Sequence, residues 1–311
     1  MTAQFDHEAL LYAGDDGFLD GAMPFVLEGL EADEPMLLVL NADKIESIKG
    51  ELNGNGGSDQ ILFADMAEVG ANPARIIPAW RRFVDEHSGE HGLVRGIGEP
   101  IWRGRTPDEL VESQRHEELL NLAFSGESSF RLLCPYDTAA LHDDVIEEAV
   151  RSHPFVIEDG VRRSSAAFRG LSAISSPFDE PLPAPPASVQ ALQFDAESLA
   201  ELRQLVATRA ADAGLKPSRA NDLVLAVNEV ATNSVRHGGG LGMLRVWMGT
   251  RWLVCEIEDE GWIGDPLVGR EEPASDESGG RGLWIANQVC DLVQVRTFAA
   301  RSLVRLHLRR P

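Results

Sequence analysis

A proline-rich stretch in the middle of the chain most constrains what this sequence can fold into. Five of the thirteen residues from Ser175 to Ala187 are proline. Proline fixes φ and has no backbone N–H, so this stretch can neither continue a helix nor form an inner strand, and it favours a semi-rigid extended linker. The 311 residues also exceed the usual size of one hydrophobic core. We therefore expect two domains, residues 1–174 and 189–311, joined by a linker at residues 175–188.

The residues before the linker alternate short apolar runs with longer amphipathic segments. The apolar runs cover residues 9–12, 36–40, 61–63, 93–97 and 130–134, and the amphipathic segments cover residues 18–31, 43–52, 74–87, 107–124 and 138–151. Strict alternation of strand and helix indicates a mostly parallel sheet with helices on both faces. The first domain is therefore predicted to be α/β, with five or six strands.

The residues after the linker follow a different order. The pattern predicts a strand at 189–194, helices at 196–213 and 217–237, a hairpin at 242–249 and 252–258, a helix at 282–290, and a second hairpin at 292–297 and 302–308. This order predicts an α+β sandwich. Residues 260–281, rich in Gly, Pro and acidic residues, are predicted to form a long functional loop.

Composition argues against several classes of protein. The net charge of −22 disfavours nucleic-acid binding, because such proteins present a basic surface to phosphates. The three cysteines, Cys134, Cys255 and Cys290, are too few and too scattered for a disulfide framework or a Cys-x-x-Cys metal site. No apolar run approaches the roughly 20 residues that span a bilayer, and the N-terminus has no signal-peptide pattern. We expect a soluble, cytoplasmic protein that does not associate with membranes.

Two familiar site types are excluded by sequence pattern. The chain has only three lysines, Lys44, Lys49 and Lys216, and none lies in Gly-Lys-Ser/Thr, which excludes a Walker-type phosphate loop. The pairs His7-Glu8 and His116-Glu117 lack a second histidine at the required spacing, which excludes a His-Glu-x-x-His zinc site.

Three ordered motifs follow the linker. Glu229, Asn233 and His237 lie four residues apart on one stripe of a predicted helix, a spacing that by itself is typical of a solvated helix face. Asp259-Glu-Gly261 ends a predicted strand, and Gly280-Arg281-Gly282-Leu283 opens a predicted helix. Glycines at a helix start expose unpaired amides to an anion, and the helix dipole adds to the attraction. In this order the motifs indicate a phosphate site.

The C-terminal 120 or so residues resemble the GHKL family of ATP-binding domains, which have the Bergerat sandwich fold. The pattern from Asn228-Glu229 to His237-Gly238 is most similar to the anti-sigma factor serine kinases of bacterial partner switching. The resemblance implies that ATP and Mg²⁺ are the cofactors and that Glu229 is the catalytic base. It implies that Asp259 accepts the adenine amino group and Asn233 binds Mg²⁺. The implied nucleotide-binding set is Asn233, Asp259, Gly261, Gly280, Arg281, Gly282 and Leu283.

The sequence departs from that family at two places. Ile263 stands where the first glycine motif usually has a second glycine, which here comes at Gly264. Arg281 also lies outside the register in which such kinases carry an arginine for the γ-phosphate. These departures leave an alternative open, a non-catalytic ATP-binding module that binds a sigma factor or an anti-anti-sigma partner.

The N-terminal part resembles the MEDS sensory domain. The resemblance lies in residues 7–12, 98–102, 134–137 and 152–154 together with Glu117. It implies a RecA-like core that has lost its phosphate loop and a sensing role toward small hydrophobic compounds. Residues at predicted strand ends can meet in a ligand crevice, although histidine and tyrosine at such places are more often structural hydrogen-bonding groups. The candidate sensory residues are His7, Tyr12, Glu99, Trp102, Glu117, Cys134 and Tyr136.

A third interpretation rests on residues 114–119. Their pattern superficially resembles the phosphoacceptor helix of sensor histidine kinases, with His116 as the acceptor, but no Leu-Arg-Thr-Pro continuation follows.

Together the two resemblances lead us to expect a regulator in which the sensory domain controls a protein-serine kinase with anti-sigma activity. The expected partners are a sigma factor, an anti-anti-sigma (STAS) protein, or both, and the family resemblance implies a homodimer.

Overall fold

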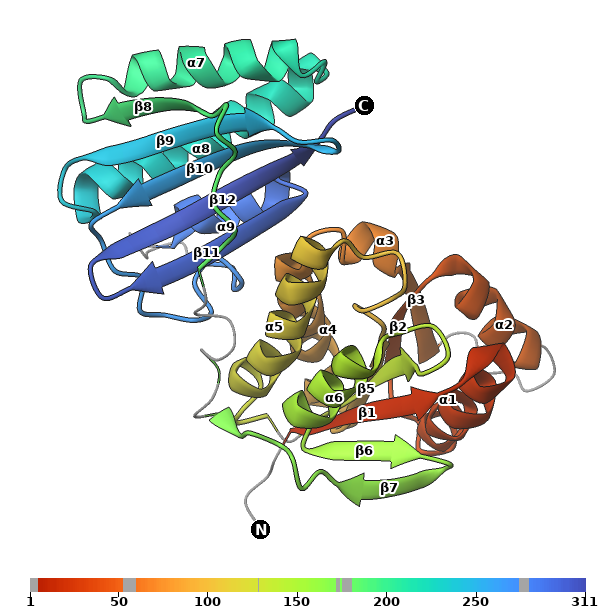
Figure 1. The fold of residues 1–311 in the computed structure, drawn as a ribbon. Helices are drawn as coiled ribbons and strands as arrows, with labels where there is room; N and C mark the ends of the chain where they lie inside the picture. The colour runs from red at the N-terminus through yellow and green to blue at the C-terminus, as the bar shows by residue number, and fades with distance from the viewer. Residues whose placement is uncertain (1–4, 53–59, 128, 172–173, 175–180, 274–279) are drawn as a thin grey trace. The chain divides into compact units, whose positions relative to one another are not determined.

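The fold is that of a computed structural model, which describes residues 5–52, 60–127, 129–171, 174, 181–273 and 280–311 (Figure 1). The chain divides into two compact units, an N-terminal unit over Met1–Ile174 and a C-terminal unit over Ser175–Pro311. Residues 175–180 of the expected linker lie outside the described residues. Residues 181–188 form no helix or strand, and the carbonyl of Pro183 accepts a hydrogen bond of 2.8 Å from Arg305 Nη2.

The N-terminal unit is built on a mostly parallel sheet. Its strands are β1 (Asp6–Tyr12), β2 (Met36–Leu40), β3 (Ile61–Asp65), β4 (Val94–Gly98), β5 (Phe130–Asp137), β6 (Phe155–Glu158) and β7 (Val161–Ser164). They lie in the order β3-β2-β4-β5-β1-β6-β7, and only β7 is antiparallel to its neighbour. The predicted parallel α/β sheet is confirmed. The sheet has seven strands, whereas the sequence predicted five or six. The difference arises because β6 and β7 are only four residues each and β7 is fully exposed.

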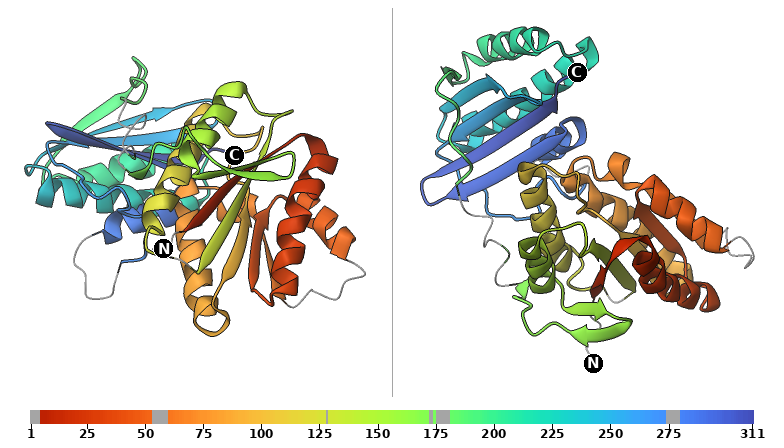
Figure 2. Two further views of the ribbon diagram at one scale, coloured as in Figure 1. Left: turned by 90° about the horizontal axis from the view of Figure 1, so that it is seen from below. Right: turned by 45° about the vertical axis from the view of Figure 1, so that its right-hand side comes forward.

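Helices cover both faces of this sheet, as Figure 2 shows. One face carries α1 (Gly14–Glu31) and α2 (Ala42–Leu52), whose apolar side chains share one core with alternate residues of β1, β2 and β4. The other helices are α3 (Met66–Val69), the short 3₁₀ helix η2 (Pro73–Arg75), α4 (Ile76–His91), α5 (Pro107–Ala123) and α6 (Asp143–Ser152). Of these, α4, α5 and α6 pack in succession on the opposite face. Alternate residues of each strand therefore meet different helices.

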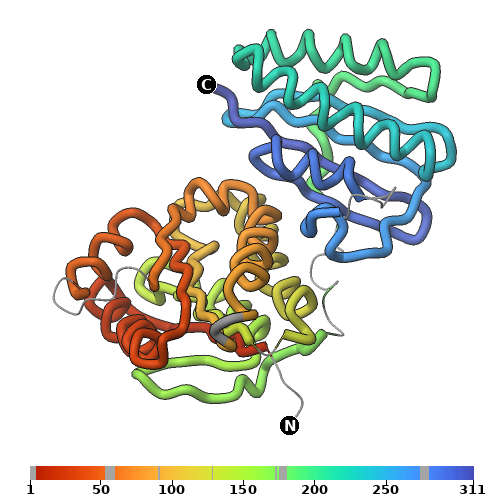
Figure 3. Tube along the Cα trace, turned by 180° about the vertical axis from the view of Figure 1, so that it is seen from behind, coloured from red at the N-terminus to blue at the C-terminus, as the bar shows by residue number. Residues whose placement is uncertain are grey.

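The C-terminal unit is an antiparallel sheet covered by helices on one face. Its strands are β8 (Gln190–Phe194), β9 (Gly242–Met248), β10 (Trp252–Asp259), β11 (Leu292–Phe298) and β12 (Arg301–Arg309), in the order β11-β12-β10-β9-β8. The helices are α7 (Leu199–Asp212), α8 (Pro217–His237) and α9 (Arg281–Val289). Figure 3 shows α8 and α9 side by side in front of the strands. All the helices and strands predicted for this part of the chain are confirmed.

Apolar side chains from the helices and the sheet form one core in the C-terminal unit. Leu223, Val227 and Val230 of α8 face Leu244 of β9 and Ile257 of β10. This packing buries one stripe of α8 and turns the adjacent stripe, with Glu229 and Asn233, toward the rim of the sheet. Among the described residues, no helix combines the length and the apolar character that crossing a membrane requires.

Candidate functional site

A pocket of about 280 Å³ opens where α8 ends, β10 ends and α9 begins. Its wall combines a carboxylate, an amide side chain and several glycines with apolar side chains. This composition suits a ligand with one flat apolar part and one polar part. The lining residues are Val230, Asn233, Arg236, His237, Gly238, Asp259, Gly261, Trp262, Ile263, Gly264, Asp265, Val268, Gly280, Leu283, Ser302 and Val304.

Asp259, the last residue of β10, is held by three hydrogen bonds. Its Oδ2 accepts from Ser234 Oγ at 2.5 Å, and its Oδ1 accepts from Gly261 N at 2.7 Å and from Ser302 Oγ at 2.7 Å. Ser302 is directly opposite Asp259 in the β10–β12 register. A carboxylate has about four lone-pair sites, so the fixed Asp259 keeps acceptor capacity for a ligand.

Glycine is required on both sides of this carboxylate. A Cβ at Gly238 would lie 2.5 Å from Asp259 Cγ, and a Cβ at Gly261 would lie 2.8 Å from Asp259 Oδ1. Both contacts are far inside van der Waals distance, so any side chain at either position would displace the carboxylate. The glycines of the Asp-x-Gly motif and of the His237-Gly238 motif therefore both make room for the Asp259 carboxylate.

The start of α9 is arranged as an anion site. Gly280 adopts the left-handed conformation at φ +79 and has no side chain that could cap the helix. The first amides of any α-helix point out of its amino end, where they can meet an anion. Gly282 is the second residue of α9, where an added Cβ would come 2.7 Å from Asn233 Nδ2 and 3.3 Å from Glu229 Cβ. The absence of a side chain at Gly282 brings the α9 backbone against the Asn233 amide.

Ile263, the departure from the usual glycine motif, is part of the pocket wall. Its side chain packs against the apolar core, and its N–H donates to Thr297 Oγ1 at 3.2 Å. The neighbouring Trp262 is 73% exposed, and a Cβ at Gly264 would lie 2.2 Å from its ring. The glycine shifted to position 264 therefore accommodates the Trp262 indole at the pocket mouth.

The structure brings together most of the residues that sequence analysis selected in this unit. Asn233, Asp259, Gly261, Gly280 and Leu283 all line the pocket. Glu229, Arg281 and Gly282 are not among its lining residues. Arg281 is exposed at the first turn of α9, and Glu229 lies one turn before Asn233 on α8. Residues 274–279 of the expected loop, which include Gly279, lie outside the described residues.

Ser234 and Ser302, whose hydroxyls hold Asp259, were not among the site residues predicted from the sequence. Ser234 directly follows Asn233 on α8, and this position beside the motif was the only sequence feature that pointed to it. No sequence pattern pointed to Ser302. It is 43 residues from Asp259 in sequence, and only the β10–β12 pairing brings the two together.

The candidate sensory residues of the N-terminal unit separate into groups on opposite faces of the sheet. Tyr12, Lys44 and Glu99, the Tyr12 cluster, lie on the face with α1 and α2. The Tyr12 hydroxyl donates to Glu99 Oε1 at 3.0 Å, and Lys44 Nζ contacts both Glu99 Oε1 and the Tyr12 hydroxyl. Burial raises the pKa of the Glu99 carboxyl, and Lys44 opposes that shift. Sequence analysis did not select Lys44.

His7, Glu117, Cys134 and Tyr136 lie on the other face and are joined there by His153, the residue that ends α6. The strand-end positions expected for His7, Tyr12, Trp102, Cys134 and Tyr136 are not all observed. His7 is near the amino end of β1, and Cys134 is inside β5, which continues to Asp137. All five side chains are at most 1% exposed. They form a buried polar cluster.

Trp102 belongs to neither group. It follows β4, is half-buried, and stacks under the Arg105 guanidinium, whose Cζ lies 3.8 Å from the ring centroid. The expected single sensory pocket is therefore two polar clusters and a separate cation–π contact, with the sheet between the two clusters.

Two family models match the chain. Residues 6–154 match the MEDS family, the methanogen/methylotroph DcmR sensory domain, and residues 192–308 match the histidine kinase-like ATPase domain. No curated protein matches the chain.

Solved structures give weak likenesses. One is a crystal structure of the RsbU and RsbW domains of a Mycobacterium tuberculosis protein, at 16% identity and a TM-score of 0.30 over 40% of this chain and 34% of that one. Another is the histidine kinase AdeS of Acinetobacter baumannii, at 14% identity and a TM-score of 0.23 over 39% of this chain and 68% of that one. These TM-scores are too low to bear on function. The two family matches identify the chain as a MEDS domain followed by a histidine kinase-like ATPase domain.

Proposed function

We propose that this protein is a signalling regulator whose C-terminal domain binds Mg-ATP and phosphorylates a serine of an anti-anti-sigma (STAS) partner. In this proposal the MEDS domain controls that activity in response to a small hydrophobic compound. The observation that carries the proposal is the pocket in which Asn233, the fixed carboxylate of Asp259 and the start of α9 at Gly280 meet. Those parts are separated by tens of residues in sequence and converge in one place.

The donor set fits Mg-ATP. The remaining acceptor capacity of Asp259 suits the amino group of adenine, with Ile263 and Val304 as apolar wall beside the base. The backbone amides at the start of α9 suit the phosphates. The amide oxygen of Asn233 is a ligand type that Mg²⁺ accepts, and the metal would neutralise phosphate charge when bound.

In this proposal Glu229 acts on the incoming serine hydroxyl. It is partly exposed, and it precedes Asn233 by one helical turn, so both side chains lie on the same stripe of α8. In the proposed transfer the serine oxygen forms a bond to the γ-phosphorus while the bond to the β-phosphate oxygen breaks and ADP leaves. The serine proton passes to the Glu229 carboxylate.

Nucleotide binding is tested by titrating the full chain with ATP and Mg²⁺ in a calorimeter, for wild type and Asp259→Asn. Loss of a hydrogen bond to a charged acceptor costs about 1.5–3 kcal/mol, so the Kd is expected to rise roughly 10- to 100-fold. Glu258→Gln is the matched control, because Glu258 is the neighbouring carboxylate of β10 and instead contacts Arg245 and Arg301. Equal affinity in wild type and Asp259→Asn would remove Asp259 from the site.

Phosphotransfer is tested with labelled ATP and candidate STAS proteins. Glu229→Gln is expected to keep ATP affinity but to slow labelling of serine roughly 100-fold or more, because general base catalysis contributes about 10²–10⁴. Asp222→Asn is the control on the same helix; Asp222 pairs with Arg219 and is outside the pocket. Labelling by Glu229→Gln at the wild-type rate would show that Glu229 is not the base.

The alternative is a non-catalytic module that binds ATP and a sigma factor or STAS partner. It is favoured by the position of Arg281, which is exposed at the start of α9 and outside the pocket lining. A wild-type protein that binds ATP and the partner but never labels a serine would establish this alternative. The histidine kinase interpretation is disfavoured, because His116 is 1% exposed within α5 and its imidazole is not accessible to a nucleotide.

The remaining parts of the proposal concern the N-terminal domain and assembly. The parallel sheet with an antiparallel edge strand supports derivation from a RecA-like core, and the chain lacks a Walker lysine. Homodimer formation is proposed from the resemblance to partner-switching kinases. Sedimentation of the full chain with and without Mg-ATP tests it, and a monomer under both conditions would contradict it.

A further inference from the structure

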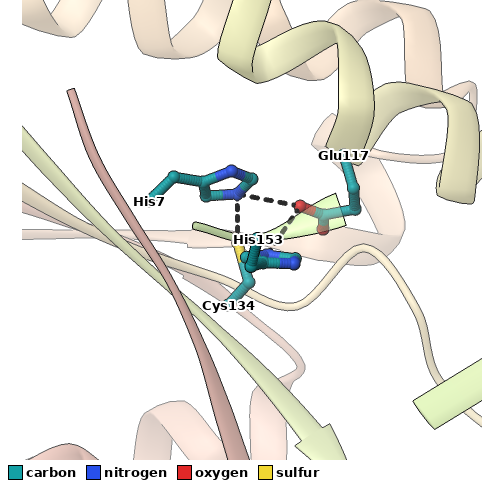
Figure 4. A group of neighbouring side chains, drawn as sticks. All are labelled: His7, Glu117, Cys134 and His153. Atoms are coloured by element: carbon teal, nitrogen blue, oxygen red, sulfur yellow. Dashed lines mark hydrogen bonds and ion pairs between the residues drawn. The ribbon is translucent and has the colours of Figure 1, made fainter. Parts of the chain in front are cut away.

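Four side chains in the N-terminal unit converge on one small volume (Figure 4). His7 comes from β1, Glu117 from α5, Cys134 from β5 and His153 from the end of α6, and we call them the His7 cluster. Each offers one metal-binding atom, and the four atoms all lie within 4.8 Å of one another. His7 and His153 are 0% exposed, and Glu117 and Cys134 are 1% exposed. The cluster therefore gathers four metal-ligating side chains of three types, imidazole, carboxylate and thiol, from four parts of the fold.

The spacing of these atoms fits a tetrahedral ion. Glu117 Oε2 lies 3.1 Å from His7 Nε2 and 3.3 Å from His153 Nε2, and Cys134 Sγ lies 3.4 Å from His7 Nε2. Zinc bonds of about 2.0–2.3 Å in tetrahedral geometry place ligand atoms about 3.3–3.8 Å apart. The three separations lie close to this range, and all four atoms lie within 4.8 Å of one another, so shifts of about 1 Å or less would bring them around one zinc ion.

The hydrogen bonds behind the histidines direct their lone pairs toward the centre of the cluster. Nδ1 of His7 lies 3.1 Å from Asn121 Oδ1, and the Asn121 amide is fixed in that orientation because its Nδ2 donates to Ser152 O at 2.8 Å. Nδ1 of His153 lies 2.8 Å from the carbonyl oxygen of Ala149. Both partners are acceptors, so each Nδ1 carries the proton, and each Nε2 of a neutral ring is an unprotonated lone pair.

This arrangement leaves acceptors facing one another. Both Nε2 lone pairs point at the same carboxylate oxygen, Glu117 Oε2. Among the described residues, Glu117 Oε1 and His153 Nε2 have no hydrogen-bond partner. Two protonated rings would place two positive charges in one buried volume, because the ring centroids are only 4.0 Å apart. A cation between the acceptors resolves the conflict.

We propose that His7, Glu117, Cys134 and His153 bind one zinc ion inside the MEDS domain. Imidazole, carboxylate and thiolate are all common zinc ligands, and four protein ligands make a closed, structural type of site. The charges of Zn²⁺, the Glu117 carboxylate and the Cys134 thiolate sum to zero, so the buried site carries no net charge. Binding displaces the thiol proton of Cys134 to solvent. Asn121 and the Ala149 carbonyl act as positioning groups that orient the two rings.

The test uses the full chain with any affinity tag removed. The protein is stripped with a chelator, reloaded with Zn²⁺ or Co²⁺ and desalted, and its metal content and absorption spectrum are measured. We expect one ion per chain, a higher melting temperature with zinc, and a thiolate-to-cobalt charge-transfer band in the Co²⁺ form. Cys134→Ser should lose that band, while Cys255→Ser, which changes a buried cysteine of the other unit, should keep it.

Two further variants separate metal binding from folding and from the nucleotide site. Asn121→Leu keeps all four ligands and should weaken zinc binding about 10- to 100-fold, the usual effect of losing a partner behind a metal ligand. Asn233→Ala should keep its zinc, because it alters only the C-terminal pocket, so the outcome does not depend on the proposed kinase function. A folded wild type that retains no metal, or a Cys134→Ser protein with an unchanged band, overturns the proposal. If Cys134→Ser does not fold, wild-type stoichiometry and the cobalt band decide.

Discussion

The stability of the C-terminal domain should depend on pH through one buried histidine, His307. This residue of β12 is 2% exposed. Its Nε2 lies 3.0 Å from Gln294 Oε1, and its ring packs edge-on against Trp252 with 5.9 Å between centroids. Burial, followed by the positive charge of Arg305, lowers the pKa of His307 from 6.5 to about 3. The folded protein therefore holds His307 neutral at any pH near neutrality.

The sign and size of the effect follow from that shift. Above pH 6.5 the histidine is neutral in the folded and the unfolded chain, and it favours neither. As pH falls below 6.5 the unfolded chain binds a proton that the folded chain does not bind until about pH 3, so stability falls with pH over this window. Each pH unit is worth about 1.4 kcal/mol. Between pH 8 and pH 5, His307 alone should remove about 2 kcal/mol from the free energy of unfolding.

The measurement is urea unfolding of the full chain at pH 8 and pH 5, with hydrogen exchange of β12 peptides to report the C-terminal domain alone. His307→Gln has no titrating ring and should lose about 2 kcal/mol less than wild type over the same pH interval. His237→Gln, which removes an exposed histidine of the same domain, is the control for the substitution. If His307→Gln and wild type lose equal stability, His307 is protonated in the folded state and the reasoning is wrong.

Two further substitutions probe close contacts in the same domain. Gly282→Ala places a Cβ 2.7 Å from Asn233 Nδ2 and should weaken ATP binding roughly tenfold with little change in melting temperature, because overpacking of about 1–3 kcal/mol offsets the helix propensity of alanine. Calorimetry tests this, with Gly50→Ala as a helical control that has open space, and unchanged affinity would contradict it. The carboxylate of Glu256 is 1% exposed and is paired with Arg305 and with Arg245 of β9. Arg305→Met leaves it with Arg245 and should lower the free energy of unfolding by about 3 kcal/mol in urea. A loss under about 1 kcal/mol would show that the pair is not effectively buried.

Local patterns predicted the elements of the C-terminal domain well because a glycine or a turn follows α7, α8, β9 and β11. The N-terminal sheet was predicted in type but not in extent. Strand β7, Val161–Ser164, has no apolar alternation and is exposed throughout, so only its pairing with β6 defines it as a strand. The first helix begins at Gly14, four residues before the predicted start, since Gly14 at φ +68 turns the chain directly out of β1.

The candidate sites show the same division. His7 and Tyr12 are five residues apart on one strand, and the alternation of side chains along a strand already places them on opposite faces. That signal was present in the sequence and argued against a single sensory pocket. No comparable signal joined His153 to His7 and Glu117, because their contact depends on the order of strands in the sheet and on the packing of α5 and α6.

By itself the sequence determined the two-part organisation, the parallel and antiparallel sheet types, and the motif order from Glu229 to Leu283. These are consequences of short-range periodicity, of proline and glycine geometry, and of the chemical types of the side chains. Only the tertiary structure decided which polar groups meet. The fixing of Asp259 by Ser234 and Ser302, and the convergence of four ligand types in the His7 cluster, both depend on pairing between distant segments. The physical reason is that such contacts are set by strand register and helix packing.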